Sequence, residues 1–176
     1  MQNRVTDRIS TFLLATNGFV NPSHPEQTRR CNEAVNSVIN VLTSLSNEYK
    51  TILPPQKRRI ALGQLLSSSL LYMNTSLSVL EDIAADESTF LIELYKKLFM
   101  LEGLFSPFEP SQVCSEWLRS QYIRELLDWR MVDIMESWKE GLLQGIFSAD
   151  EMVGWIRRLF QDSDVRARNI ATILNG

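Results

Sequence analysis

The sequence predicts an all-α fold, an antiparallel helical bundle or short helical rod of about six or seven helices. Three observations lead to this prediction. Apolar residues recur every three or four positions along most of the 176 residues, as on one face of a helix. Segments that alternate apolar and polar residues, as half-buried strands do, are lacking. Proline and glycine gather in short stretches such as NGFVNPSHP and GLFSPFEP, which separate the helical segments.

Three helices are expected in the first half of the chain. A short first helix carries an apolar stripe and ends at the NGFVNPSHP stretch. A second runs from Pro25 to about Tyr49, and the LPP stretch at 53–55 stops it. A third begins with Pro55, whose missing N–H is harmless in a first turn, and continues to about residue 85. The stripe of the first helix consists of Val5, Ile9, Phe12 and Leu13.

The second half is expected to hold two further helices before the closing segment. Ser88 is a candidate cap for a fourth helix, which has leucines at helical spacing from Leu91 to Leu101. A long fifth helix spans about 111–140 and is interrupted by Gly141 and Gly145.

A helical hairpin is expected at about 148–174. Ser148 and Glu151 have the S-x-x-E spacing of a capping box, so a helix should begin there. Trp155 stands at the edge of the apolar stripe of this helix. The candidate caps of the last helix are Asp162, Ser163 and Asp164. The stripe consists of Met152, Ile156, Leu159 and Phe160.

Composition favours one globular helical domain over residues 1–176. Hydrophobic residues make up 44% of the chain, enough for a substantial core, and the formal net charge is only −3. Because 18 basic and 21 acidic residues are interspersed, a nucleic-acid partner is not expected.

Cys31 and Cys114 lie in apolar helical patterns and are expected to be buried thiols in a reducing cytoplasm. The KRR run at 57–59 is interpreted as a solvated first-turn face rather than a localisation signal.

Neither catalytic nor metal-binding patterns occur in the sequence. His24 is the only histidine and lies in a proline-flanked loop. Phosphate-binding loops, dinucleotide fingerprints and HExxH sequences are absent. No apolar run approaches the ~18 residues that span a bilayer. We therefore expect no enzyme activity, no cofactor, no metal and no direct membrane insertion.

Ordered pieces of the chain resemble the C-terminal region of the Zeste-White-Ten family, the animal relatives of the yeast Dsl tether subunit. The terminal stretch FSADEMVGWIRRLFQDSDVRARNIATI resembles the family's closing pattern. Trp117 and Trp138 have the spacing of two tryptophans that flank the family's long helix, and LEDI at 80–83 and LPP at 53–55 also fit. The resemblance covers roughly residues 28–174. In the terminal stretch it includes Phe147, Ser148, Glu151, Ile156, Arg157, Leu159, Phe160, Gln161, Arg166, Ala171 and Ile173.

This resemblance implies a C-terminal fragment of a longer rod-shaped subunit. In such a family the domain would dock on an α-solenoid subunit, either the neuroblastoma-amplified or Sec-type protein at the endoplasmic reticulum, or Rod with Zwilch at animal kinetochores. The leading hypothesis is a non-enzymatic interaction domain of a multisubunit tether that captures Golgi-derived COPI vesicles and works with SNAREs. The implied location is cytoplasmic and peripheral on the endoplasmic reticulum. The alternatives are a kinetochore scaffold of the spindle checkpoint and, from another class, a ligand-binding or catalytic helical bundle.

The outer face of the terminal hairpin is the candidate partner surface. An alternative interpretation places Trp155 in the core and pairs these arginines with Asp150, Asp162 and Asp164. The residues assigned to partner binding are Trp155, Arg157, Arg158, Arg166 and Arg168.

Overall fold

The computed structural model describes residues 2–175, and every regular element in that range is a helix. This confirms the predicted all-α class. The number of α-helices in the described range is eight, not six or seven. They are α1 (Gln2–Leu14), α2 (Pro25–Ile52), α3 (Pro55–Ser78), α4 (Ala85–Phe99), α5 (Trp117–Asp128), α6 (Met131–Lys139), α7 (Ala149–Leu159) and α8 (Asp164–Leu174). Short 3₁₀ helices are η1 (Asn17–Phe19), η2 (Met100–Leu104) and η3 (Pro110–Gln112).

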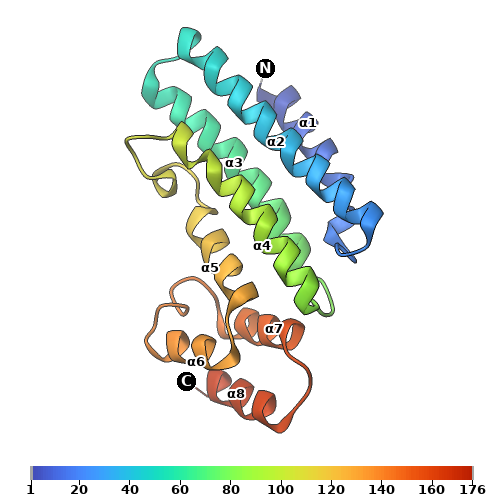
Figure 1. The fold of residues 1–176 in the computed structure, drawn as a ribbon. Coiled ribbons are helices and arrows are strands. Elements are labelled where there is room, and N and C mark those ends of the chain that lie inside the picture. The colour runs from blue at the N-terminus through green and yellow to red at the C-terminus, as the bar shows by residue number, and fades with distance from the viewer. Residues whose placement is uncertain (1, 176) are drawn as a thin grey trace.

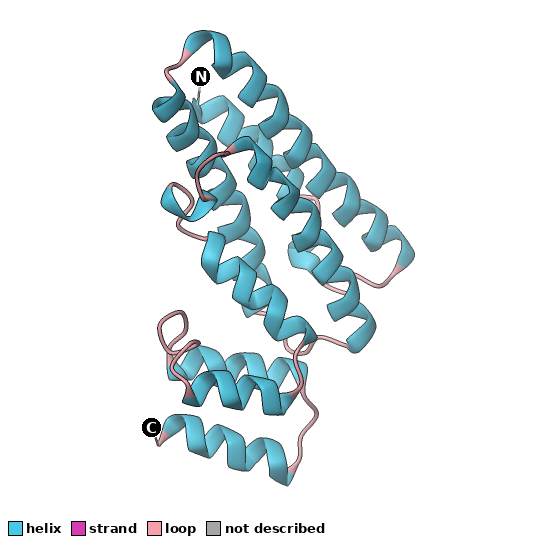
Figure 2. Cartoon of the chain, turned by 60° about the vertical axis from the view of Figure 1, so that its left-hand side comes forward, coloured by secondary structure: helices cyan, strands magenta, loops and turns pink. Residues whose placement is uncertain are grey.

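The first five α-helices run alternately up and down and form an elongated bundle (Figure 1). Helix α2 contacts α1, α3 and α4, while α5 packs against α4 and α3. Helices α6, α7 and α8 gather at the end of the bundle where α3 turns into α4, and they lie across its long axis (Figures 1 and 2). The N-terminal end of α1 therefore lies at the opposite end of the molecule from the terminal helices.

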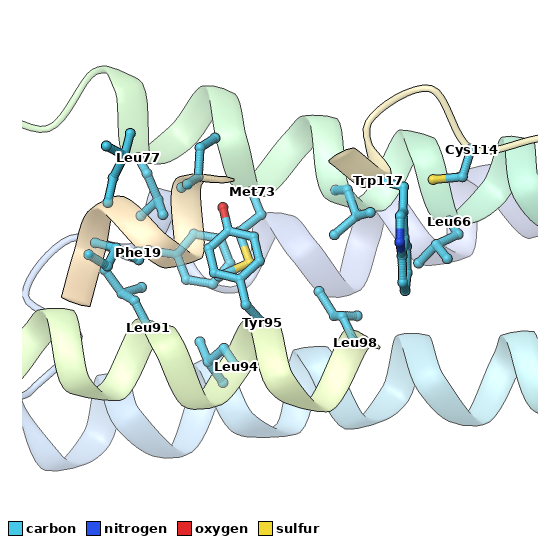
Figure 3. Packing of buried hydrophobic residues seen from close by; sticks show 14 of the residues in the cluster. Phe19, Leu66, Met73, Leu77, Leu91, Leu94, Tyr95, Leu98, Cys114 and Trp117 are labelled. Atoms are coloured by element: carbon cyan, nitrogen blue, oxygen red, sulfur yellow. The ribbon is translucent and has the colours of Figure 1, made fainter. Parts of the chain in front are cut away.

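The turn between α1 and α2 places an aromatic ring in the core. Asn17, Gly18 and Phe19 all have positive φ, which glycine and asparagine tolerate better than a bulky residue does. This backbone directs Phe19 inward, where its side chain is fully buried between the long helices (Figure 3). The buried side chains of Ile9 and Leu13 also anchor helix α1 to the core.

Leucine, methionine and aromatic side chains of α3, α4 and α5 meet in the bundle interior (Figure 3). Phe99 packs edge-on against Trp117, with ring centroids 4.9 Å apart. Cys31 and Cys114 are also buried, as predicted, and burial raises the pKa of each thiol to about 11. Both cysteines are therefore protonated packing residues at neutral pH.

A small polar network crosses this apolar interior and joins α3, α4 and α5. The fully buried Tyr95 hydroxyl donates to Asn74 Oδ1 at 2.7 Å. Asn74 Nδ2 in turn donates to Glu116 Oε2 and to Ser120 Oγ, each at 3.0 Å. Burial, and secondarily the Glu116 carboxylate, raise the pKa of Tyr95, so the phenol remains a donor. Because every member of the network has a partner, it fixes the relative register of three helices.

The predicted boundaries of the third and fourth helices are wrong near the α3–α4 turn. Helix α3 ends at Ser78, not near residue 85, and α4 begins at Ala85. Ser88 is buried inside α4 and caps nothing. The Glu87 carboxylate instead accepts the Ala84 N–H at 3.0 Å, which fixes the start of α4.

The predicted helix over 111–140 is two helices joined by a sharp break. Trp129 and Arg130 have extended backbone angles and separate α5 from α6. The Asp133 carboxylate accepts both the backbone N–H and the side-chain Nε–H of Arg130, each at 3.0 Å. This bonding begins a new helix without proline or glycine, and that explains the missed boundary.

Candidate interaction surface

The terminal hairpin begins as predicted. Ser148 Oγ accepts the Glu151 N–H at 3.2 Å, and the Glu151 carboxylate accepts the Ser148 N–H at 2.8 Å, so the capping box is present. Ser163 caps α8 by accepting the Arg166 N–H at 3.1 Å. Helices α7 and α8 then pack against each other.

Trp155 is not on the outer face, and the prediction that it is exposed is wrong. Only 2% of this residue is exposed, and Val153 beside it is also buried. Helix α7 buries an arc wider than the predicted stripe, because residues on both sides of that stripe enter the core. As the alternative interpretation held, Trp155 belongs to the core.

Arg158 bonds internally across the molecule. Its Nε donates to the Leu80 carbonyl at 2.8 Å, and its Nη2 donates to the Ser78 carbonyl. The Ile83 N–H donates back to the Arg158 carbonyl at 2.9 Å. Burial lowers the pKa of the guanidinium. Arg158 therefore caps the C-terminal end of α3, where a positive charge is favourable, and holds α7 against the α3–α4 turn.

Gly154 makes room for this arginine. A Cβ at Gly154 would lie 2.8 Å from Arg158 Nη1, so the guanidinium crosses the helix directly over the glycine. The two residues are one turn apart on α7 and act together.

Arg166 also bonds within the hairpin. It forms an ion pair with Asp162 at 2.7 Å and donates to the Phe160 carbonyl at 2.7 Å. The pairing with Asp162 was part of the alternative interpretation and is confirmed. Arg168 does not pair with the Asp164 carboxylate. Its Nε donates to the Asp164 backbone carbonyl at 3.3 Å.

Two of the five assigned side chains remain available at the surface. Arg157 and Arg168 are exposed, and neither forms an ion pair within residues 2–175. Val165 and Thr172 share a face of α8 with Arg168 and are exposed as well, which sequence reasoning did not single out. We name these four residues, Arg157, Val165, Arg168 and Thr172, the hairpin outer face.

A further arginine that the sequence did not single out ties α5 to the hairpin. Arg119 donates to the Ile146 carbonyl at 2.9 Å and pairs with Glu151 at 2.5 Å. Its guanidinium lies 4.8 Å from the centre of the Phe147 ring. Burial alone would raise the pKa of Glu151, but the Ser148 N–H and Arg119 outweigh it, so this pKa is lowered.

Two open grooves flank α3 and meet at the half-exposed Leu71. One, of about 450 Å³, lies between α1 and α3 and is mostly apolar. The other, of about 590 Å³, lies between α3, α5 and α7 and includes Asp150 and Arg119. His24 lines neither groove and is exposed where α2 begins. No cluster of three or more potential metal ligands occurs among the residues that the structure describes.

None of the helices within residues 2–175 combines the length and apolarity needed to cross a bilayer. The features that stand out are a packed helical core and a charged outer face. They define the chain as an all-helical bundle domain whose candidate site is a surface.

The chain belongs to the family of the ZW10 C-terminal helical domain, whose family model matches residues 33–173. It is 27% identical to the centromere/kinetochore protein zw10 homolog of Mus musculus, over 92% of this chain and 22% of that protein. Identity to the centromere/kinetochore protein zw10 of Drosophila melanogaster is 29%, over 80% of this chain and 20% of that protein. The homolog of Arabidopsis thaliana is 24% identical over 86% of this chain and 22% of that protein.

The chain thus spans about a fifth of the length of these relatives. The matched region includes the terminal hairpin and every helix from most of α2 onward. Helix α1 precedes it but packs against α2 and α3. These comparisons confirm the family that the sequence pattern indicated.

Proposed function

We propose that this chain is a non-enzymatic protein–protein interaction domain of a multisubunit vesicle tether. In this proposal the tether acts in Golgi-to-endoplasmic-reticulum (COPI) retrograde transport, and the domain docks on an α-solenoid partner subunit. Membership of the family of the ZW10 C-terminal helical domain is the observation that carries the proposal. The tethering role is what the resemblance to the Zeste-White-Ten family implies. SNAREs and the other tether subunits would be reached through the assembled complex.

The hairpin outer face is the proposed contact. Arg157 and Arg168 project into solvent, whereas Arg158 and Arg166 are engaged by backbone carbonyls. Arginine with neighbouring apolar side chains is typical of residues that dominate binding at protein interfaces. Because the capping box of α7, the Ser163 cap of α8 and the bonds of Arg158 hold the hairpin rigidly, docking would require little ordering of this face.

A kinetochore scaffold that works with Rod and Zwilch is the second candidate. It is favoured by the names of the mouse, fly and plant relatives, which are centromere/kinetochore proteins. Both candidates use a protein partner, and the same face could serve either one.

The test is a pull-down of the purified chain against the α-solenoid tether subunit and, separately, against Rod with Zwilch. Stable capture of the tether subunit supports the first proposal, whereas capture of Rod–Zwilch alone supports the second. Failure to bind either partner would overturn both.

A surface variant then locates the contact. Arg157→Glu/Arg168→Glu should reduce capture at least about tenfold while the circular dichroism spectrum stays helical. The matched control is Arg29→Glu/Lys139→Glu, which makes the same charge change on exposed residues of α2 and α6. Equal loss in both variants would show an effect of net charge and would remove the hairpin outer face from the proposal.

A further inference from the structure

The end of the bundle opposite α6, α7 and α8 carries an excess of positively charged side chains. No aspartate or glutamate occurs between residues 49 and 80, whereas Lys50, Lys57, Arg58 and Arg59 cluster around the α2–α3 turn. Helix α1 adds Arg4 and Arg8, which line a groove together with Glu48 of α2. We call these six cations the basic tip: Arg4, Arg8, Lys50, Lys57, Arg58 and Arg59.

The basic tip is positive even when its neighbouring acids are counted. Asp7 and Glu48 lie on the same helices, and Glu109 follows Phe108, whose ring stacks on Arg59. Six cations and three carboxylates give a net charge of +3. Since the whole chain carries −3, the remainder carries −6. The tip therefore stands out from an otherwise acidic molecule.

Carboxylates do not neutralise the three cations at the start of α3, although Arg59 stacks on the Phe108 ring. None of Lys57, Arg58 and Arg59 forms an ion pair with the residues described by the structure. The Nε atoms of Arg58 and Arg59 are buried without a hydrogen-bond acceptor. Their position near the start of α3 is electrostatically unfavourable, because the positive end of the helix dipole repels them.

Apolar side chains are exposed among the same cations. Ile52 is 66% exposed at the end of α2, and Ile60 is 42% exposed on α3. Phe108, 45% exposed, lies with its ring centre 3.5 Å from the Arg59 guanidinium carbon. Cations interspersed with protruding isoleucine and phenylalanine suit a surface that is negatively charged outside and apolar beneath.

We propose that the basic tip is a peripheral contact for an anionic lipid surface. A turn between two helices is convex and presents few side chains, whereas a stable protein interface needs roughly 800 Å² from each partner. A lipid surface has no such requirement, because each Lys or Arg contributes separately. The contact is peripheral, with cations at the headgroups and the exposed apolar side chains just below them.

The position of the tip fits a domain that also docks a protein. Helix α3 has 24 residues, so its ends are about 36 Å apart, and the hairpin lies beyond the far end (Figure 1). A membrane at one end and a partner at the other would not compete for the same surface. The lipid contact goes beyond the proposed function and does not depend on which partner docks.

The test is co-sedimentation of the chain with vesicles at 50 and 200 mM salt. One set contains phosphatidylcholine alone, and the other contains 30% phosphatidylserine. Wild type should bind only the anionic vesicles, and more weakly at the higher salt concentration. Lys50→Glu/Lys57→Glu reverses two exposed cations of the tip and should lower the partition coefficient at least roughly thirty-fold, which is the loss expected from removing two cations alone. Arg29→Glu/Lys139→Glu makes the same charge change elsewhere and should stay near wild type.

Three outcomes would overturn the proposal. They are no binding to anionic vesicles, equal binding to neutral ones, and equal loss in both variants. If the chain does not bind vesicles and Lys50→Glu/Lys57→Glu abolishes capture by the α-solenoid subunit, the tip is a protein-docking surface instead. Since vesicle binding and partner capture are measured separately, failure of one proposal is distinguishable from failure of the other.

Discussion

The long-helix bundle and the terminal unit of α6, α7 and α8 are stabilised in different ways. In the bundle, helices of up to 28 residues present continuous apolar faces, and one small polar network fixes their register. In the terminal unit, helices of 9 to 11 residues depend on bonds between side chains and backbone at their ends. Short helices have few packing contacts, so their caps decide where they begin and end.

The arginines in and around the terminal unit fall into two groups. Arg119, Arg158 and Arg166 bind carbonyls that helix ends or loops leave unpaired, so they are part of the fold. Arg157 directly precedes Arg158, and Arg168 follows Arg166 by two residues, but both face solvent. Only the latter two are available to a partner, and substitutions can separate the two groups.

The largest expected effect comes from Trp155→Ala. Removing this buried ring should lower the free energy of unfolding by about 3–5 kcal/mol, because it leaves a large cavity where the terminal unit meets the bundle. Denaturant titration followed by circular dichroism measures the change. Trp129→Ala is the control and should cost less, since Trp129 is only partly buried. A loss below about 1 kcal/mol for Trp155→Ala would contradict a core role.

In the bundle, Asn74→Ala should lower the free energy of unfolding by about 2–3 kcal/mol. It leaves the fully buried Tyr95 hydroxyl without its acceptor and removes the donor to Glu116. Tyr95→Phe deletes only one hydroxyl, so about 1 kcal/mol is expected there. A double-mutant cycle between the two positions measures their coupling. Additive effects would show that the network does not act as a unit.

The adjacent arginines Arg157 and Arg158 give the sharpest comparison within the hairpin. Arg158→Gln should lower the free energy of unfolding by about 1–3 kcal/mol, because the Ser78 and Leu80 carbonyls lose their donor. Arg157→Gln should change it by less than about 0.5 kcal/mol. Thermal and denaturant unfolding of both variants would check this. Equal values would show that the internal bonds of Arg158 contribute no net stability.

The smallest expected effect concerns Glu151 and pH. Its pKa is lowered in the folded state, so the stabilisation it provides is present above its unfolded pKa of about 4.3 and is lost as pH falls through the folded value. Between pH 7 and pH 4 the free energy of unfolding should therefore fall less in Glu151→Gln than in wild type. The two losses should differ by under about 1 kcal/mol, because the site is partly exposed. Unfolding at both pH values measures the difference. An identical loss in wild type and variant would contradict it.

Sequence reasoning succeeds where a local signal sets the structure. The Ser148–Glu151 spacing marks the start of α7 by itself, and proline marks the starts of α2 and α3. The break at Trp129 has no proline or glycine. Its signal was the carboxylate of Asp133, three residues after Arg130, which a search for Ser or Thr caps passes over.

The hairpin surface was only partly predictable, for a physical reason. The helical period assigns Trp155 to the edge of a stripe, but tertiary packing decides whether an edge is covered. The Ser78 and Leu80 carbonyls are 80 and 78 positions away from Arg158 in the sequence, so no local pattern reveals that contact. Arg157 and Arg158 are indistinguishable in the sequence and differ only in the folded chain.

The most direct test of the central claim is the affinity of the α-solenoid tether subunit for this chain, measured by isothermal titration calorimetry. Wild type, Arg157→Glu/Arg168→Glu and Arg29→Glu/Lys139→Glu would be compared at one salt concentration. We predict a dissociation constant at least about tenfold weaker for the hairpin variant and unchanged for the control, with both variants as stable as wild type. An unchanged affinity in the hairpin variant would contradict the claim that the free arginines of α7 and α8 form the docking face.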